Sequence, residues 1–214
     1  MTKGILISFE GPDGAGKTSI LQAVKPLLQE ELSRNIIITR EPGGVEISER
    51  IRDVILNVNH TAMDSKTELL LYIAARRQHL VEKIIPALAR GEIVLVDRFI
   101  DSSVAYQGYG RGLDKDSISW LNDFVIENYQ PDLTILFDVS AEIGLKRIEE
   151  NDNREVNRLD LEKVDMHHRV RNGYLNLLKD ESHRIIKVDA SQDFSTVLSE
   201  TKQLLLNFIN VNKG

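Results

Sequence analysis

A glycine-rich segment that ends in a lysine and a threonine is the strongest chemical signal in the sequence. It reads GPDGAGKT and matches the pattern G-x-x-x-x-G-K-[ST]. Backbone N–H groups and the start of the following helix surround a polyphosphate in this pattern, the lysine adds positive charge, and the threonine hydroxyl can ligate Mg²⁺. A chance glycine-rich turn is the alternative. The pattern predicts a nucleotide-phosphate site at Gly11, Pro12, Asp13, Gly14, Ala15, Gly16, Lys17, Thr18 and Ser19, with Thr18 as a metal ligand.

An aspartate at the end of an apolar run is the second candidate metal ligand. Asp97 follows the residues Ile-Val-Leu-Val, and sites of this kind usually place such a carboxylate near the metal. We expect Asp97 and Lys17 to face each other across one Mg²⁺ and one triphosphate. The alternative is that Asp97 only terminates a strand.

Three arginines indicate a second anion site beside the first. Arg40 ends one apolar run, Arg98 comes directly after another, and Arg76 lies in a segment with helical periodicity. Guanidinium groups bind phosphate bidentately, so Arg40 and Arg98 are candidates to hold the phosphate of an acceptor. For Arg76 alone, a surface ion pair carries about equal weight.

A phosphate acceptor would need positive charge rather than a general base. A phosphomonoester is mostly dianionic at pH 7 and needs no deprotonation before it attacks. Its repulsion from a triphosphate must be offset by cations in a site closed to water. The polar segment 147–158, RIEENDNREVNR, is suited to a mobile lid that brings Arg154 or Arg158 onto the transferring phosphoryl group. A solvated loop of mixed charge is the alternative.

Five apolar runs predict the strands that position these residues, at 4–10, 35–40, 92–97, 132–139 and 184–189. The runs are nearly continuous rather than alternating, which is typical of parallel strands buried on both faces. Helical patterns lie between or after them, at 16–33, 45–58, 65–90, 114–128, 141–150, 159–180 and from Phe194 onward. We expect an α/β protein with a P-loop NTPase-like three-layer fold, a five-stranded parallel sheet flanked by helices, and ligands at the carboxyl ends of the strands.

One helix boundary carries a specific expectation. Ser65 and Glu68 have the spacing of a capping box, and Pro86 predicts a kink later in the same helix.

Composition indicates one globular domain over residues 1–214. The chain has 42% hydrophobic residues, no cysteine and a net charge of -6. The absence of cysteine excludes disulfides and thiolate metal sites and is compatible with the cytoplasm, and no stretch approaches the length of a membrane span. The negative charge argues against broad contact with nucleic acid, so any anion site must be local. We therefore expect a cytoplasmic protein without membrane or nucleic-acid partners.

Six segments together resemble the thymidylate kinase family over nearly the whole chain. They read FEGPDGAGKT from Phe9, TREPGG from Thr39, LLYIAARRQHL from Leu70, DRFIDSSVAYQGYGRG from Asp97, PDLTILFDV from Pro131 and NRLD from Asn157. Each short piece is a weak signal, but the set in this order is highly specific. The resemblance, to the bacterial type, implies Mg²⁺-dependent transfer of the γ-phosphoryl group of ATP to dTMP, giving dTDP and ADP in dTTP biosynthesis. It also implies a homodimer.

The resemblance assigns roles around the acceptor phosphate. It implies that Asp13 reaches the 3′-OH of the sugar and that Arg40 and Arg98 hold the phosphate. Some family members carry an arginine inside the P-loop, whereas this chain has Asp-Gly-Ala there. The lid would then supply that charge, through Arg154 or Arg158.

The resemblance also assigns residues to the acceptor base and sugar. Tyr72 stands where the family usually has a phenylalanine stacked on thymine, and its ring keeps the stacking face. Arg76 would address the base, Ser103 and Gln107 would complete hydrogen bonds to its edge, and Tyr106 would lie under the deoxyribose and exclude a 2′-hydroxyl. The alternatives are half-buried aromatics for the two tyrosines, a helix cap for Ser103 and a solvated loop position for Gln107.

Two other functions compete with this one. A kinase acting on a hydroxyl acceptor would need a carboxylate base and would leave Arg40 and Arg98 with little to bind. A nucleotide-dependent switch is the other alternative. The sequence disfavours it, because the Asn212-Lys213 pair precedes the final glycine and cannot complete a guanine-recognition motif. In addition, Asp97 is followed by Arg-Phe-Ile rather than by x-x-Gly.

Overall fold

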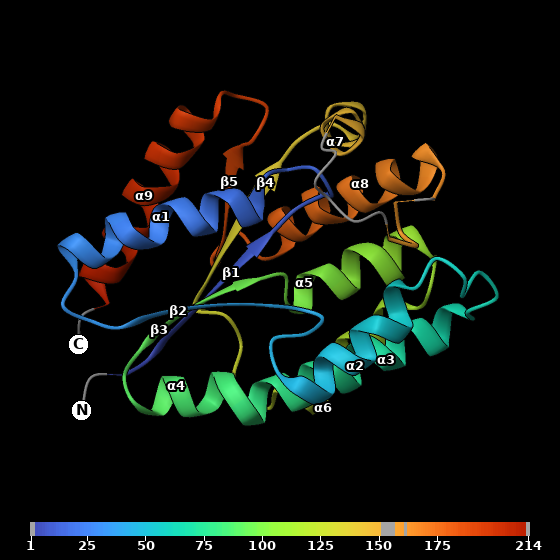
Figure 1. Ribbon diagram of the computed structural model, residues 1–214, viewed down its shortest axis with the longest axis horizontal. Coiled ribbons are helices and arrows are strands. Elements are labelled where there is room, and N and C mark those ends of the chain that lie inside the picture. Colours follow the sequence, from blue (N-terminus) through green and yellow to red (C-terminus); the bar gives the residue numbers. More distant parts are fainter. Residues whose placement is uncertain (1–2, 151–156, 161, 213–214) are drawn as a thin grey trace.

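A five-stranded parallel sheet runs through the middle of the molecule (Figure 1). The computed structural model describes residues 3–150, 157–160 and 162–212. The strands are β1 (Ile5–Glu10), β2 (Ile36–Arg40), β3 (Ile93–Asp97), β4 (Leu133–Asp138) and β5 (Ile185–Asp189), in the order β2-β3-β1-β4-β5. Each neighbouring pair is parallel, which confirms the expected fold class.

The register brings the predicted site residues to one edge of the sheet. Phe9 of β1 and Arg40 of β2 are both aligned with Asp97 of β3. The carboxyl ends of these three strands therefore meet, as parallel sheets with a ligand at this edge require.

Helices cover both faces of the sheet and give the three-layer arrangement. One face carries α1 (Lys17–Glu31) and α9 (Phe194–Val211), which lie side by side in Figure 1. The other helices are α2 (Glu46–Leu56), α3 (Ser65–His79), α4 (Ile85–Ala89), α5 (Ile100–Ser103), α6 (Lys115–Ile126), α7 (Ala141–Glu149) and α8 (Val164–Asp180). Two π-helical turns, η1 (Leu80–Ile84) and η2 (Val104–Gly110), continue α3 and α5.

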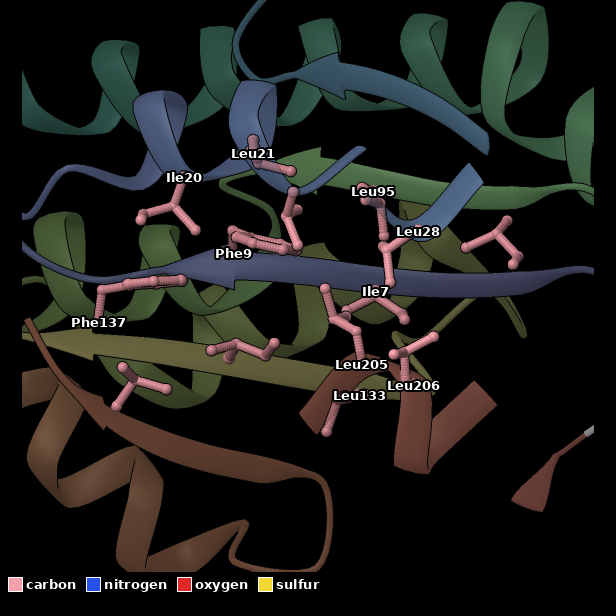
Figure 2. Packing of buried hydrophobic residues seen from close by; sticks show 14 of the residues in the cluster. Ile7, Phe9, Ile20, Leu21, Leu28, Leu95, Leu133, Phe137, Leu205 and Leu206 are labelled. Atoms are coloured by element: carbon pink, nitrogen blue, oxygen red, sulfur yellow. The ribbon is translucent and has the colours of Figure 1, made fainter. Parts of the chain in front are cut away.

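Alternation along β1 divides the core into two faces. Ile7 and Phe9 pack against α1 and α9, and Figure 2 shows them between Leu21 and Leu205 of those helices. Leu6, which precedes Ile7, packs on the opposite face, with α3, α4 and α6. The central strands β1 and β3 are buried along their whole length, as the apolar runs predict, whereas β2 and β5 are partly exposed because they form the edges.

Two details of the predicted helix at 65–90 differ in the structure. The capping-box prediction is wrong, because Asp64 is the N-cap and accepts hydrogen bonds from the N–H groups of Lys66 and Thr67, at 3.0 and 3.2 Å. Glu68 is instead drawn into a buried cluster of ion pairs. Before Pro86, which cannot donate a backbone hydrogen bond, the helix widens into the η1 turn.

Two further segments depart from the predicted pattern. The helix expected from Leu159 begins at Val164, since 158–160 form a turn. The helical segment from Ile100 to Gly110 was not predicted, because its glycines and serines have low helix propensity. Within the described residues, none of the helices has the length and apolar character needed to cross a membrane.

Candidate active site

Glycines let the P-loop fold tightly between β1 and α1. Gly14 and Gly16 adopt φ values of 74° and 81°, a region that disfavours other residues. A Cβ atom on Gly14 would lie 2.1 Å from the carbonyl oxygen of Gly144 in α7. Gly144 is thus a site-supporting residue that the sequence pattern did not indicate.

Lys17 is buried and points back over the loop. Its Nζ donates hydrogen bonds to the carbonyl oxygens of Gly11 (3.0 Å) and Pro12 (2.8 Å). Burial and the neighbouring Arg98 charge lower the pKa of Lys17 to about 8, against the opposing effect of Asp97 and other carboxylates. A bound polyphosphate would favour the protonated amine.

Thr18 and Asp97 provide adjacent oxygen ligands suited to Mg²⁺. The Thr18 hydroxyl donates a hydrogen bond to Asp97 Oδ2, and both residues line a cavity of about 440 Å³ over the P-loop. Mg²⁺ is usually held by one or two protein oxygens together with phosphates and water. The described residues contain no cluster of three or more His, Cys, Asp or Glu suited to a metal.

Arg98 joins the P-loop to the second predicted pocket. Its Nη2 lies 2.7 Å from Asp13 Oδ1 and 3.0 Å from the Tyr106 hydroxyl, while Nη1 donates to the Gly11 carbonyl at 3.0 Å. Tyr106 in turn donates to Asp13 Oδ2 at 2.7 Å. The structure therefore brings together Asp13, Arg98 and Tyr106, which the resemblance placed around the acceptor.

A buried carboxylate supports the backbone that carries Arg98. Arg98 has a φ of 67°, unusual for a residue other than glycine. Next to it, Glu10 accepts hydrogen bonds from the Phe99 N–H (2.7 Å), the Ser102 hydroxyl (2.6 Å) and the Tyr174 hydroxyl (3.0 Å). Glu10 and Tyr174 were missed, because they lie 164 positions apart and only the fold joins them.

Arg76 lines the second pocket, and its guanidinium is fixed there by several hydrogen bonds. Its guanidinium donates to Glu41 Oε2 (2.7 Å), Ser103 Oγ (3.0 Å), Asn122 Oδ1 (2.6 Å) and the Phe99 carbonyl (2.9 Å). The surface ion pair considered for Arg76 is therefore excluded. Ser103 is buried and accepts this hydrogen bond from Arg76, so two of the side chains predicted to contact the acceptor base lie together.

The remaining predicted residues of this pocket are also brought together. Tyr72 lines both this pocket and the P-loop cavity, and Gln107 lines this pocket with Ser103 and Tyr106. Gln107 is only 2% exposed, which excludes a solvated loop position, and its Nε2 donates to Glu68 at 2.8 Å.

Arg40 lies on the wall of the P-loop cavity with a second arginine. Arg40 pairs with Glu49 of α2 at 2.8 Å, and Arg52 donates to the Pro42 carbonyl at 3.0 Å. Burial and the adjacent Arg40 charge lower the pKa of Arg52. Two like charges at one cavity wall are suited to an anion, so Arg52 is a candidate that the sequence analysis missed.

The lid segment 147–158 is described only at its two ends. Arg147 lines the P-loop cavity and donates to the Ala190 carbonyl at 2.8 Å, whereas Arg154 lies outside the described residues. The structure does not bring Arg158 to the P-loop. Its side chain is buried against Glu68 and the Ile55 carbonyl, so its predicted contact with the phosphoryl group stays a prediction that requires it to leave Glu68.

The fold and these two adjoining pockets define a P-loop kinase. A family model described as thymidylate kinase matches residues 9–201. The crystal structure of thymidylate kinase from Ehrlichia chaffeensis is 35% identical to this chain, with a TM-score of 0.76, covering 95% of this chain and 98% of that one. The chain belongs to the thymidylate kinase family, and its activity is the phosphorylation of dTMP to dTDP.

Proposed function

We propose that ATP is the phosphoryl donor, with its triphosphate in the P-loop cavity, and that dTMP occupies the pocket lined by Arg76 and Gln107. The observation that carries this proposal is that the two pockets adjoin and share Asp13, Tyr72 and Arg98 in their walls. An arginine on that boundary can contact the phosphate of one nucleotide while the P-loop holds the other.

The chemistry follows from the placement of charge. The dTMP phosphate, dianionic at neutral pH, attacks the γ-phosphorus, and the bond to the β,γ-bridging oxygen breaks. Arg98 and the Arg40–Arg52 pair hold the acceptor phosphate, while Lys17 contacts the transferring group. Mg²⁺ bound by Thr18 and Asp97 would neutralise charge on the triphosphate when present. Asp13 is positioned for the 3′-OH of dTMP.

A steady-state assay of acceptors tests this function. With ATP and a coupled ADP readout, we expect turnover of dTMP to exceed that of dUMP, UMP and AMP, and thymidine to be inactive because it has no phosphate to offer. Turnover of thymidine but not of dTMP would contradict the acceptor assignment. Slow ATP hydrolysis insensitive to dTMP would instead indicate a nucleotide-dependent switch.

We further propose that two copies associate through α3 and α6. Trp120 and Phe124 of α6 are 63% and 69% exposed, and their rings stack with centroids 5.6 Å apart. Leu70 on the neighbouring α3 is also exposed. Stacked aromatics are typical anchors of protein interfaces, and a two-fold dimer would place this pair against its own copy.

Negative charge introduced at this face is expected to separate the dimer. The Trp120→Glu, Phe124→Glu double variant would bury four carboxylates per dimer and should sediment as a monomer in analytical ultracentrifugation. The control is Val211→Glu, which changes an exposed apolar residue on α9 and should leave the sedimentation coefficient unchanged. A double variant that sediments like the unmodified protein would contradict this interface.

The domain organisation, location and partners of the chain stay predictions from its sequence. We propose a single kinase domain that works in the cytoplasm, in the formation of dTTP, without membrane or nucleic-acid partners. The family assignment and the sequence-wide net charge of -6 support this proposal.

A further inference from the structure

Glu68 of α3 places one buried carboxylate among several hydrogen-bond donors. It is 1% exposed and accepts from Gln107 Nε2 (2.8 Å), Arg111 Nη2 (2.9 Å) and Arg158 Nη2. Arg111 also pairs with Glu162 at 2.5 Å, so the cluster of Glu68, Arg111, Arg158 and Glu162 is balanced in charge. This cluster adjoins the wall of the acceptor pocket, to which Gln107 belongs.

The charge of Glu68 decides how the Gln107 amide is turned. Burial opposes ionisation, but the hydrogen bonds from Arg111, Gln107 and Arg158 outweigh it and lower the pKa of Glu68. An ionised carboxylate can only accept hydrogen bonds. The amide nitrogen of Gln107, and never its oxygen, must therefore face Glu68.

The other end of the amide is left for a ligand. Among the hydrogen bonds of the described residues, none reaches Oε1 of Gln107, although the side chain is almost fully buried. This oxygen is not among the enclosed side-chain atoms that lack a partner in that part of the chain, and Gln107 lines the acceptor pocket, so Oε1 is open to an occupant of the pocket. A carbonyl oxygen can only accept a hydrogen bond, so the occupant has to donate one. On the ring of a pyrimidine ligand, the hydrogen-bond donor at that point is an N–H group.

We propose that Glu68 is a positioning residue that fixes Gln107 with its carbonyl oxygen toward the acceptor base, so that the pocket selects a pyrimidine carrying a proton on ring nitrogen 3. Thymine has this N–H, whereas cytosine has a lone pair at the same atom and would face the oxygen with a second acceptor. This inference deepens the proposed dTMP pocket and rests on it.

The proposal is tested by the preference for dTMP over dCMP in Glu68→Gln. A glutamine at this position can donate or accept, so the amide of Gln107 becomes free to turn its N–H toward cytosine. We expect the ratio of kcat/KM for dTMP to that for dCMP to fall by about tenfold or more, since a site built around one hydrogen bond strongly rejects a ligand that lacks it. The KM for ATP should stay within about twofold, because Glu68 does not line the P-loop cavity.

The matched control is Glu162→Gln, which removes the other carboxylate on Arg111 but has no contact with Gln107 among the described residues. It should keep the dTMP:dCMP ratio of the unmodified enzyme. A folded Glu68→Gln variant with an unchanged ratio would overturn the proposal, as would an equal fall of the ratio in Glu162→Gln.

A ligand-side measurement covers the case in which Glu68→Gln fails to fold. The 3-methyl derivative of dTMP has no N–H at this atom, and we expect the unmodified enzyme to lose at least about tenfold in kcat/KM with it relative to dTMP. In Gln107→Ala, which removes the oxygen and leaves room for the methyl group, the two acceptors should become nearly equal. Equal use of both by the unmodified enzyme would overturn the inference while leaving the proposed kinase function intact. That function would fail only if dTMP itself were not phosphorylated.

Discussion

Replacing Lys17 by alanine is expected to lower kcat by a factor on the order of 10² or more. The amine is buried at the P-loop and lies next to two carbonyl oxygens, from which it can turn to the transferring phosphoryl group. Charge develops on that group in the transition state, and a preorganised cation in a site shielded from water stabilises it more than it stabilises the bound substrate. The loss should therefore fall on kcat more than on KM, in steady-state kinetics with ATP and dTMP.

The pH profile of the unmodified enzyme provides an independent check on Lys17. Its pKa of about 8 in the free site means that the amine is charged below this pH and neutral above it. Since kcat/KM reports the free enzyme, kcat/KM for ATP should decline as the pH rises through about 8. Lys17→Arg, whose side chain stays charged, should show no such decline although its activity is lower.

Two outcomes would contradict this role of Lys17. One is near-normal kcat in a Lys17→Ala variant whose thermal unfolding matches that of the unmodified enzyme. The other is a decline in kcat/KM near pH 8 that persists in Lys17→Arg, because the titrating group would then be a different one.

The parts that could be predicted from the sequence are those encoded by neighbouring residues. The P-loop is recognisable because its glycines, Lys17 and Thr18 lie within eight positions of the chain. The buried strands are recognisable because each continuous apolar run is short, is rich in β-branched residues and is bounded by turn or charge signals. From these two signals the sheet edge and the approach of Asp97 to Thr18 follow, and the structure brings both residues together.

The parts that could not be predicted depend on partners distant in the sequence. Glu68 has the spacing from Ser65 that is typical of a helix cap. In the structure its carboxylate instead binds Arg111 and Arg158, which lie 43 and 90 positions further along the chain. In a single sequence, a charged residue that is buried in such a long-range ion pair cannot be distinguished from one that is exposed to solvent. The support of Arg98 by Glu10 is hidden for the same reason.

The π-helical turn η2 could not be predicted from the sequence either. It carries Tyr106 and Gln107 on adjacent positions, and both line the acceptor pocket. A regular helical or strand period would not predict that two consecutive residues both line one pocket. Wide helical turns of this type are often found at functional sites. The resemblance to a known family, rather than any periodicity, supplied these two residues.

Arg98→Ala is expected to weaken dTMP binding by about 30-fold to 100-fold while ATP binding changes by less than about threefold. A charge-assisted hydrogen bond to a phosphate contributes on the order of 2 kcal/mol, and a bidentate contact more. Isothermal titration with each nucleotide alone measures the two effects separately. Arg90→Ala removes an exposed arginine that pairs with Glu92 outside both pockets, and as a control it should leave both affinities unchanged.

The role of Arg98 is decided by comparing the losses of affinity for dTMP and for ATP, because this residue also contacts the P-loop. Its Nη1 donates to the Gly11 carbonyl, and its Nη2 orders Asp13. If Arg98 served chiefly to hold the loop in shape, its removal would weaken ATP and dTMP by the same factor. A selective loss of dTMP requires instead that the guanidinium contacts the acceptor phosphate. Equal losses for both nucleotides would therefore contradict an acceptor-binding role and leave Arg98 as a support of the P-loop.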